Sequence, residues 1–237
     1  MTIGFRILPR RRKVDADMVA RFRDLPLANV SDVMSRMAAA GPWLRPMHGG
    51  GGLAGPALTV KTRPGDNLLV HKAIDIAEPG DVIVVDAGGD LTNAIVGELM
   101  VAHAAKRGLA GFVIDGAIRD SGAIRAGSFP VFAAGVTHRG PYKDGPGEIN
   151  CTIALNGMVV EPGDLVLGDD DGVLSVAFAD VNEVHRAAAA KRQAETEQFA
   201  AISAGTSDRG WVDAALRRLG CAFVDEAWAK VPERQRP

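Results

Sequence analysis

The sequence predicts an α/β fold whose core is a parallel sheet formed by a βαβαβ unit. Two continuous apolar runs, at residues 82–85 and 111–114, are typical of strands that are buried on both faces. Residues 129–133 read as a third strand. A helical pattern at 97–107, stopped by a glycine, and a short one at 121–126 separate the strands. Strands that alternate with helices in this way form parallel sheets.

The segments before this core carry helical and turn signals. Residues 15–40 have a helical pattern. The four consecutive glycines at 49–52 predict a loop, which is either a flexible connector or a close approach to a ligand. The tripeptide Pro-Gly-Asp occurs at 64–66, 79–81 and 162–164, each time before an apolar run. Proline followed by glycine suits a turn whose third residue has a positive φ, so we interpret the repeat as a reused turn-plus-strand device.

The C-terminal part predicts antiparallel additions and then helices. Residues 158–176 look like hairpin strands around a polar turn at 169–172, which lacks the ligand spacing of a calcium loop. An Ala-rich helix is expected at 180–204 and a short one at 211–219. We therefore expect one domain over 1–237, with its core at about 25–178 and a helical extension at about 180–225.

Composition and charge exclude several classes of protein. The chain has 237 residues, 24% of them charged, with a net charge of −2, so it lacks the basic footprint of a nucleic-acid binder. The basic run at 10–13 is interpreted as a solvated arm. No apolar run approaches the ~18 residues of a membrane span. Cys151 and Cys221 lie far apart and outside any motif, which favours a reducing, cytoplasmic location. Histidine spacing does not suggest zinc.

Two loops are expected to carry the chemistry, because ligands gather at the carboxyl ends of parallel strands. The loop at 86–100 enters a helix at Gly97, where the backbone N–H groups of Glu98, Leu99 and Met100 can receive an anion. The loop at 115–120 supplies Arg119, a planar fork for a carboxylate, and Asp120, a ligand for a hard cation. Taken separately, these features also fit simple helix capping and a surface ion pair.

Residues 80–135 resemble the family of 4-hydroxy-4-methyl-2-oxoglutarate aldolases. The family also includes 4-carboxy-4-hydroxy-2-oxoadipate aldolases and the regulator of ribonuclease activity A. The resemblance is carried by Gly-Glu-Leu-Met at 97–100, Val-Ile-Asp-Gly at 113–116 and the Arg119-Asp120 pair. It extends more loosely from VSDVMSR (30–36) through GPALTV (55–60) to GDDDGV (168–173).

The resemblance implies a role for each of these residues. The segment 97–100 would bind substrate, partly through backbone amides, and Arg119 would bind substrate and a catalytic water. Asp120 would be the direct protein ligand of Mg²⁺ or Mn²⁺, with waters completing the shell. Members assemble as trimers or hexamers with sites between subunits. An acid from a neighbour's C-terminal helix, here Glu195 or Glu197, can enter the site.

The implied activity is metal-dependent cleavage of 4-hydroxy-4-methyl-2-oxoglutarate or 4-carboxy-4-hydroxy-2-oxoadipate, as in aromatic-compound catabolism. The products would be pyruvate and a second 2-oxo acid. Oxaloacetate decarboxylation should accompany it, since both reactions pass through the enolate of pyruvate. The motif contains no histidine, so a water near Arg119 is the candidate base. The alternative is a non-catalytic protein that binds and inhibits ribonuclease E, but the helical region at 180–225 looks like the aldolase members.

Overall fold

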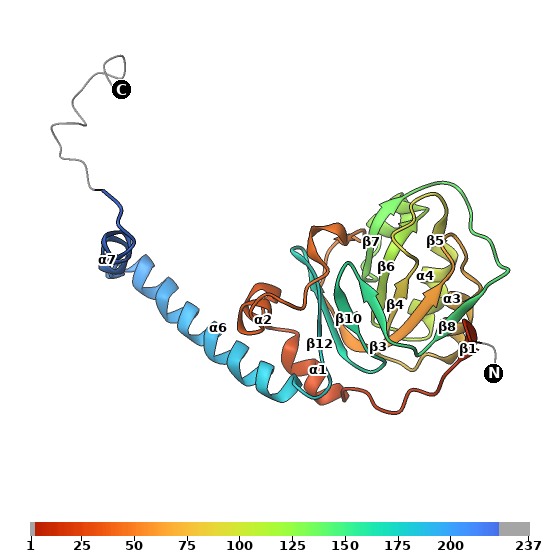
Figure 1. Cartoon of the computed structure of the whole chain (residues 1–237), viewed down its shortest axis with the longest axis horizontal. Coiled ribbons are helices and arrows are strands. Elements are labelled where there is room, and N and C mark those ends of the chain that lie inside the picture. The colour runs from red at the N-terminus through yellow and green to blue at the C-terminus, as the bar shows by residue number, and fades with distance from the viewer. Residues whose placement is uncertain (1–2, 223–237) are drawn as a thin grey trace, which may run out of the picture. The chain divides into compact units, whose positions relative to one another are not determined.

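The computed structural model describes residues 3–222, which fall into two compact units, 3–192 and 193–222 (Figure 1). Within these residues no helix is both long and apolar enough to cross a membrane. The helices are α1 (Ala16–Phe22), α2 (Leu27–Val33), the 3-10 turn η1 (Gly41–Trp43), α3 (Leu68–Ile76), α4 (Glu98–Lys106), α5 (Ser121–Ala126), α6 (Val181–Ser203) and α7 (Gly210–Arg218). The strands are β1 (Phe5–Ile7), β2 (Arg45–Pro46), β3 (Leu53–Thr62), β4 (Val82–Asp86), β5 (Ala94–Val96), β6 (Gly111–Ile118), β7 (Val131–Val136), β8 (Gly147–Ile149), β9 (Ile153–Leu155), β10 (Met158–Val160), β11 (Leu165–Asp169) and β12 (Gly172–Val176).

A mixed sheet forms the centre of the first unit, in the order β1-β8-β3-β4-β6-β7-β2. β3, β4, β6 and β7 run parallel to one another, and β5 pairs in parallel with β6. β8 and β11 add antiparallel pairing to β3, and β12 pairs with β11. The α/β class, the parallel βαβαβ core and the antiparallel additions predicted from the sequence are therefore confirmed.

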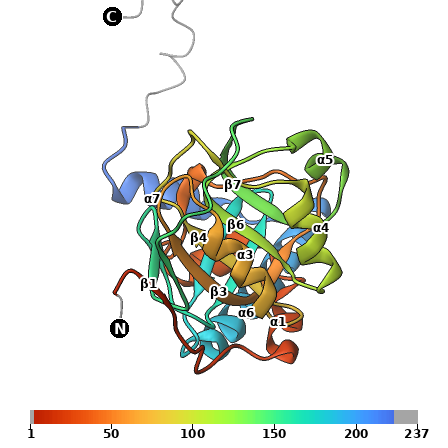
Figure 2. The ribbon, with the colours of Figure 1, turned by 90° about the vertical axis from the view of Figure 1, so that its right-hand side faces the viewer.

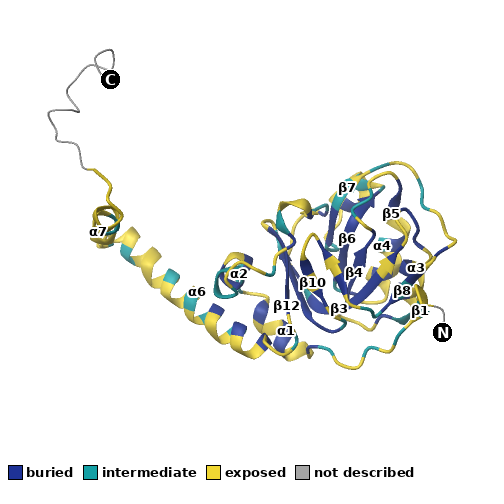
Figure 3. Cartoon of the chain, in the orientation of Figure 1, coloured by how far each residue is buried: buried dark blue, intermediate teal, exposed yellow. Residues whose placement is uncertain are grey.

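Alternate residues of the central strands enter two different cores, which explains their unbroken apolar runs. Ile83 and Val85 of β4 pack with α3, α4 and α5 on one face of the sheet (Figure 2). Val82 and Val84 pack on the other face with β9 and β10. All four side chains are fully buried, as the dark central strands show (Figure 3). Because both faces are covered, apolar side chains occupy successive positions of β4 from Val82 to Val85 and do not alternate with polar ones.

Three predicted boundaries are corrected. The strand predicted at 129–133 is β7 at Val131–Val136. Residues 15–40 form only α1 and α2, because the chain turns at Pro26 and α2 ends at Val33, just before Ser35 and Arg36, whose φ values of 56° and 62° do not continue a helix. β6 continues to Ile118, four residues beyond its predicted end, because β5 supplies a parallel partner for Ala117 and Ile118. The predicted loop at 115–120 is thus mostly strand.

The Pro-Gly-Asp tripeptides form the predicted turns, with φ values of 75°, 87° and 92° at Gly65, Gly80 and Gly163. The turn-plus-strand interpretation is wrong for the first copy, which leads into α3. The carboxylate of Asp66 accepts the N–H of Leu68 at 2.9 Å and so satisfies a free donor at the helix start. In the other two copies the aspartate instead accepts an N–H within its own turn, and a strand follows.

The basic run at 10–13 is not a solvated arm. Arg10 is 9% exposed and its Nη2 lies 2.9 Å from Oδ2 of Asp81, which is fully buried. Lys13 pairs with Glu78 of the same turn, and Arg12 pairs with Glu161 of the third turn at 2.7 Å. A buried carboxylate needs a partner of opposite charge, which Arg10 supplies to Asp81. The run therefore binds two Glu-Pro-Gly-Asp turns through ion pairs.

The C-terminal hairpin and both helices are found, but residues 158–160 form β10, which pairs with β9 and not within the predicted hairpin, and the end of the predicted extension at 223–225 lies outside the described residues. β11 and β12 form a hairpin, and Asp169 at its turn accepts the N–H of Leu27 at 3.0 Å, capping α2. α6 and α7 begin and end within one residue of the predicted helices at 180–204 and 211–219. Among the described residues, the second unit comprises the C-terminal part of α6, then α7 and the chain up to residue 222.

Candidate active site

The start of α4 and the end of β6 meet at the carboxyl edge of the sheet. Gly97 is the N-cap of α4, and the N–H of Arg119 donates to the carbonyl of Val96 at 2.9 Å. Oδ2 of Asp120 accepts the N–H of Glu98 at 3.0 Å. The structure therefore brings together Gly97–Met100, Arg119 and Asp120, which the sequence placed on two separate loops.

Glycine is needed at position 97 because of space rather than conformation. Its φ of −137° is ordinary extended backbone. A Cβ added there would lie 2.6 Å from Oδ2 of Asp120 and 3.0 Å from both Cγ and Nε of Arg119. Real Cβ atoms essentially never lie 2.6 Å from another heavy atom, and 3.0 Å is unusually close, so an alanine here would force both side chains to shift. Both functional side chains thus pass directly over the bare backbone at the beginning of α4.

Asp120 has a backbone conformation that non-glycine residues seldom adopt. Its φ and ψ are 56° and 34°, in the left-handed region. Such strain costs about 1–3 kcal/mol and tends to occur at functional sites. Although Asp120 is the N-cap of α5, its side chain makes no capping hydrogen bond to α5 and instead reaches α4. The left-handed backbone thus directs the carboxylate away from its own helix.

The backbone amides at the start of α4 are not equally available. The N–H of Glu98 is used by Asp120, and that of Met100 donates to the carbonyl of Gly97 at 3.1 Å. No hydrogen bond of the Leu99 N–H is found within residues 3–222. Since unpaired N–H groups at a helix start favour anions, Leu99 supplies the available donor.

A cavity of about 230 Å³ opens beside these residues. Its wall includes two basic side chains, Arg119 and Lys143, together with His71 and Asn67, and none of the lining residues is acidic. The pKa of His71 is held below its ordinary value, first by burial and then by the positive charge of Lys143. The cavity therefore favours an anionic ligand of modest size.

The polar loop at 137–150 forms one wall of this cavity. Gly140, Pro141 and Lys143 line it. Asp66, which is fully buried, fixes this loop by accepting the N–H groups of Asp144 at 2.7 Å and Gly145 at 2.9 Å. Sequence reasoning left the role of this loop open.

Three lining residues with polar side chains were missed by sequence reasoning: Asn67, His71 and Lys143. Asn67 and His71 are one helical turn apart at the start of α3, directly after the first Pro-Gly-Asp turn. This four-residue spacing would have placed both side chains on one face of a helix. It was missed because the residues after the first Pro-Gly-Asp turn were interpreted as a strand. Oδ1 of Asn67 is buried and makes no hydrogen bond within the described part of the chain.

Asp120 fits the requirements of a hard divalent cation. Its side chain is 42% exposed, and only Oδ2 is used by Glu98. No cluster of three or more histidine, cysteine, aspartate or glutamate side chains suited to a metal exists within residues 3–222. Mg²⁺ typically binds through one or two carboxylates and keeps several waters, so a single aspartate beside an open cavity suits it. Glu195 and Glu197 lie on α6, in the second unit, where Glu197 accepts a hydrogen bond from Gln193 at 2.9 Å.

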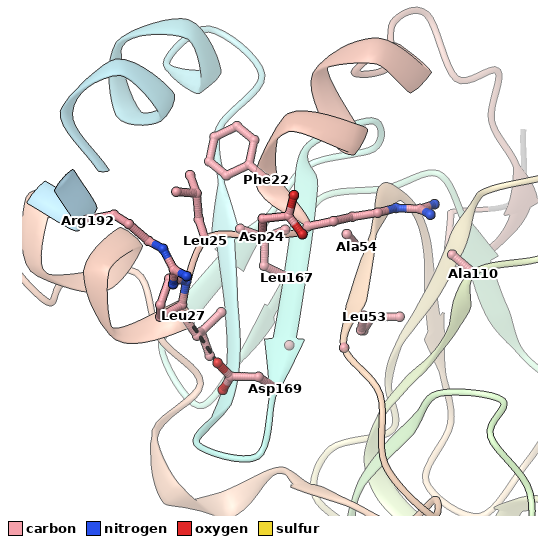
Figure 4. Close-up of a pocket in the computed structure, with 14 residues that line it drawn as sticks. Phe22, Asp24, Leu25, Leu27, Leu53, Ala54, Ala110, Leu167, Asp169 and Arg192 are labelled. Atoms are coloured by element: carbon pink, nitrogen blue, oxygen red, sulfur yellow. Dashed lines mark hydrogen bonds between the residues drawn. The ribbon is translucent and has the colours of Figure 1, made fainter. Parts of the chain in front are cut away.

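A larger cavity, of about 560 Å³, lies elsewhere in the first unit, among the α1–α2 turn, β3 and β11 (Figure 4). Its wall mixes apolar residues with four charged ones, of which Asp169 accepts the N–H of Leu27 at the start of α2. Gly52, the last of the four consecutive glycines, lines this cavity and not the candidate site. Gly50 and Gly51 have φ values of 110° and 102°, a backbone conformation that side-chain-bearing residues rarely adopt, which explains glycine at these two positions.

Two neighbouring buried carboxylates, Asp86 and Asp115, lie near the ends of the central strands. Asp115 on β6 is 8% exposed, and Nε1 of Trp43 donates to its Oδ1 at 3.1 Å. Its neighbour across the sheet is Asp86 of β4. The pKa of Asp115 is raised, chiefly by burial and further by the charge of Asp86, against the opposing effect of the Trp43 hydrogen bond.

We expect Asp115→Asn to stabilise the protein at neutral pH. A raised pKa means that the folded state holds the proton more tightly than the unfolded state, so ionisation destabilises the fold. The wild-type free energy of unfolding should fall, relative to that of the variant, as pH rises from below 3.8 through the raised pKa. Urea titrations at several pH values between 3.5 and 7 would measure the difference. A gap that stays constant with pH would contradict the assignment.

The fold and the site define an α/β protein with a small cationic cavity at the carboxyl edge of a parallel sheet. The model of the RraA-like family, described as Aldolase/RraA, matches residues 27–175. The chain belongs to this family, which confirms the resemblance found in the sequence.

Relatives with different names share this fold. A protein of Halalkalibacterium halodurans named "Putative 4-hydroxy-4-methyl-2-oxoglutarate aldolase" is 40% identical over 185 residues, which cover 78% of this chain and 88% of the relative. The solved structure of the RNA-processing inhibitor RraA from Thermus is 30% identical, with a TM-score of 0.60 over 65% of this chain and 93% of that one. An uncharacterised protein from Pseudomonas syringae is 25% identical, with a TM-score of 0.74 over 82% and 96%.

Proposed function

We propose that this protein is a lyase that depends on Mg²⁺ or Mn²⁺ and cleaves 4-hydroxy-2-oxo acids to pyruvate and a second 2-oxo acid. The substrates proposed are 4-hydroxy-4-methyl-2-oxoglutarate and 4-carboxy-4-hydroxy-2-oxoadipate, with oxaloacetate decarboxylation as a side activity. The observation that carries the proposal is that Arg119 and the start of α4 line one cationic cavity, while Asp120 is hydrogen-bonded to the first residue of α4 and lies beside Arg119.

The residues of the site divide the work between binding and charge stabilisation. The N–H of Leu99 and the guanidinium of Arg119 bind the substrate carboxylate, since both are donors at the cavity wall. Asp120 would hold the divalent cation, and the chemistry that such a cation supplies is Lewis-acid polarisation of the 2-oxo group. Arg119 stabilises the negative charge that develops on the substrate when the C–C bond breaks, and holds the water that takes the hydroxyl proton.

We expect Gly97→Ala to abolish most of this activity without unfolding the protein. The added methyl group would displace the carboxylate of Asp120 and the stem of Arg119 from the start of α4. A misplacement of about 1 Å can cost on the order of 10²-fold in rate. Steady-state pyruvate release, with circular dichroism as the folding check and Gly122→Ala as control, measures this. Gly122 has no atom within 4 Å of an added Cβ. Normal turnover in Gly97→Ala would show that the close approach is unimportant.

We further propose that the protein assembles as a trimer or hexamer, with Glu195 or Glu197 of a neighbouring subunit contributing to the site. Ala188 is buried in the core of its own subunit, but the small side chains of Ala187, Ala190 and Ala194 are exposed on α6 and allow another helix to approach closely, which suits a subunit contact. Multi-angle light scattering at micromolar concentration should give three or six times the mass of the 24.9 kDa chain. A monomer under these conditions would rule out an acid donated by a neighbour.

The second candidate function is inhibition of ribonuclease E by binding, which is favoured by the 30% identity to a protein named as an RNA-processing inhibitor. A coupled assay for pyruvate, run on both proposed substrates and on oxaloacetate, separates the two. Turnover of any of them that depends on Mg²⁺ supports the lyase. No turnover, together with slower RNA cleavage by ribonuclease E in its presence, supports the inhibitor.

A further inference from the structure

The guanidinium of Arg119 is held by packing rather than by a strong ion pair. Its Nε lies 3.7 Å from Oδ2 of Asp120, beyond hydrogen-bond range, and the side chain is 43% exposed. A Cβ added at Gly97 would lie 3.0 Å from Nε, and one added at Gly140 would lie 3.2 Å from Nη1. The side chain therefore passes between two bare backbones, one at the start of α4 and one in the loop at 137–150.

Asn93 holds the second of these backbones in place. Its Nδ2 donates to the carbonyl of Gly140 at 2.5 Å, and the N–H of the next residue, Ala94, donates to the carbonyl of Arg139 at 2.9 Å. Asn93 is 7% exposed, and its side chain is packed against the first Pro-Gly-Asp turn, where a Cβ added at Gly65 would lie 3.1 Å from the Cβ of Asn93. Asn93 is therefore a buried, closely packed side chain that holds the backbone of Gly140 through a hydrogen bond.

We propose that Asn93 is a positioning residue for Arg119, acting through the backbone of Gly140. Its amide keeps the loop against the guanidinium, so that the planar fork is oriented toward the cavity before substrate arrives. Such sites must be held within about 0.5 Å and 10–20° of the productive geometry. The catalytic consequence rests on the function proposed above, whereas the positioning itself does not.

The isosteric change Asn93→Asp keeps the shape of the side chain but replaces its amide donor by a carboxylate oxygen and adds a negative charge. Asn156→Asp is the matched control, because Asn156 also donates from Nδ2 to a backbone carbonyl, that of Ala40 at 3.2 Å, and does not line the cavity. The ¹⁵N-¹H signal of Arg119 Nε, identified by its loss in Arg119→Lys, reports the order of the side chain. We expect it to shift and lose order in Asn93→Asp and to stay unchanged in Asn156→Asp. An unchanged signal in Asn93→Asp overturns the proposal.

A double-mutant cycle tests the catalytic consequence. If Asn93 acts through Arg119, Asn93→Asp should lower kcat about 10-fold in the wild-type background but less than about 2-fold in the Arg119→Lys background, because coupled sites are not additive. Equal losses in both backgrounds would mean a general structural role and would also overturn the proposal. If the wild-type protein releases no pyruvate from any substrate, the proposed function fails, and the Arg119 signal alone decides whether Asn93 positions it.

Discussion

Replacing Asp120 by asparagine is expected to reduce metal-dependent pyruvate release by more than about 10³-fold, since Lewis-acid catalysis is worth several kcal/mol. Asparagine keeps an oxygen that can accept the N–H of Glu98, and it tolerates the left-handed backbone found here. What it loses is the negative charge that a hard cation requires. The fold should therefore survive while turnover does not.

Initial rates at saturating Mg²⁺, compared with melting curves, test this prediction. The control is Asp115→Asn, which removes a buried carboxylate from β6, the strand that precedes Asp120. If Asp120→Asn turns over at a near-normal rate while remaining folded, Asp120 is not the ligand. If both variants lose activity equally, the effect is not specific to the position of Asp120.

Replacing Arg119 by lysine should lower kcat by about 10²–10³-fold, the usual cost of losing one preorganised donor. Lysine keeps the charge but loses the planar fork, which donates several hydrogen bonds in fixed directions. If the arginine only anchored the substrate carboxylate, KM would rise and kcat would be spared. A loss of kcat is expected because the guanidinium also stabilises charge that develops during C–C cleavage.

Full saturation curves are needed to separate these two outcomes. Arg125→Lys serves as the control, since Arg125 is an exposed arginine on α5, the helix that follows Asp120. An Arg119→Lys variant that reaches the wild-type kcat at high substrate concentration would make Arg119 a binding residue alone. The cationic cavity would then account for affinity, and the chemistry would have to be assigned to other groups.

The parts of the fold that were predictable are those whose pattern is local. β4 and the start of β6 are continuous apolar runs because both faces of each strand are covered. β5 was missed because three residues acquire a strand conformation only through pairing with β6. The basic run at 10–13 was misread because its partners, the turns at 78–81 and 161–164, are distant in sequence.

The candidate site divides in the same way. Gly97, Arg119 and Asp120 belong to two short motifs that follow neighbouring strands, so their meeting could be inferred from sheet topology. Lys143 lies in the loop at 137–150. The path of this loop is set by two hydrogen bonds, one from Asp144 to Asp66 and one from Asn93 to Gly140. Such contacts between distant segments leave no periodic pattern in the sequence.

The central claim is that a divalent cation and the Arg119–Asp120 junction together break a carbon–carbon bond. Its most direct test is pyruvate release from 4-hydroxy-4-methyl-2-oxoglutarate by protein stripped with a chelator and then titrated with Mg²⁺. We predict no release from the stripped protein, saturable recovery with added Mg²⁺, and no recovery in Asp120→Asn. Release that is unaffected by stripping, or no release by the wild-type protein at any Mg²⁺ concentration, would contradict the account.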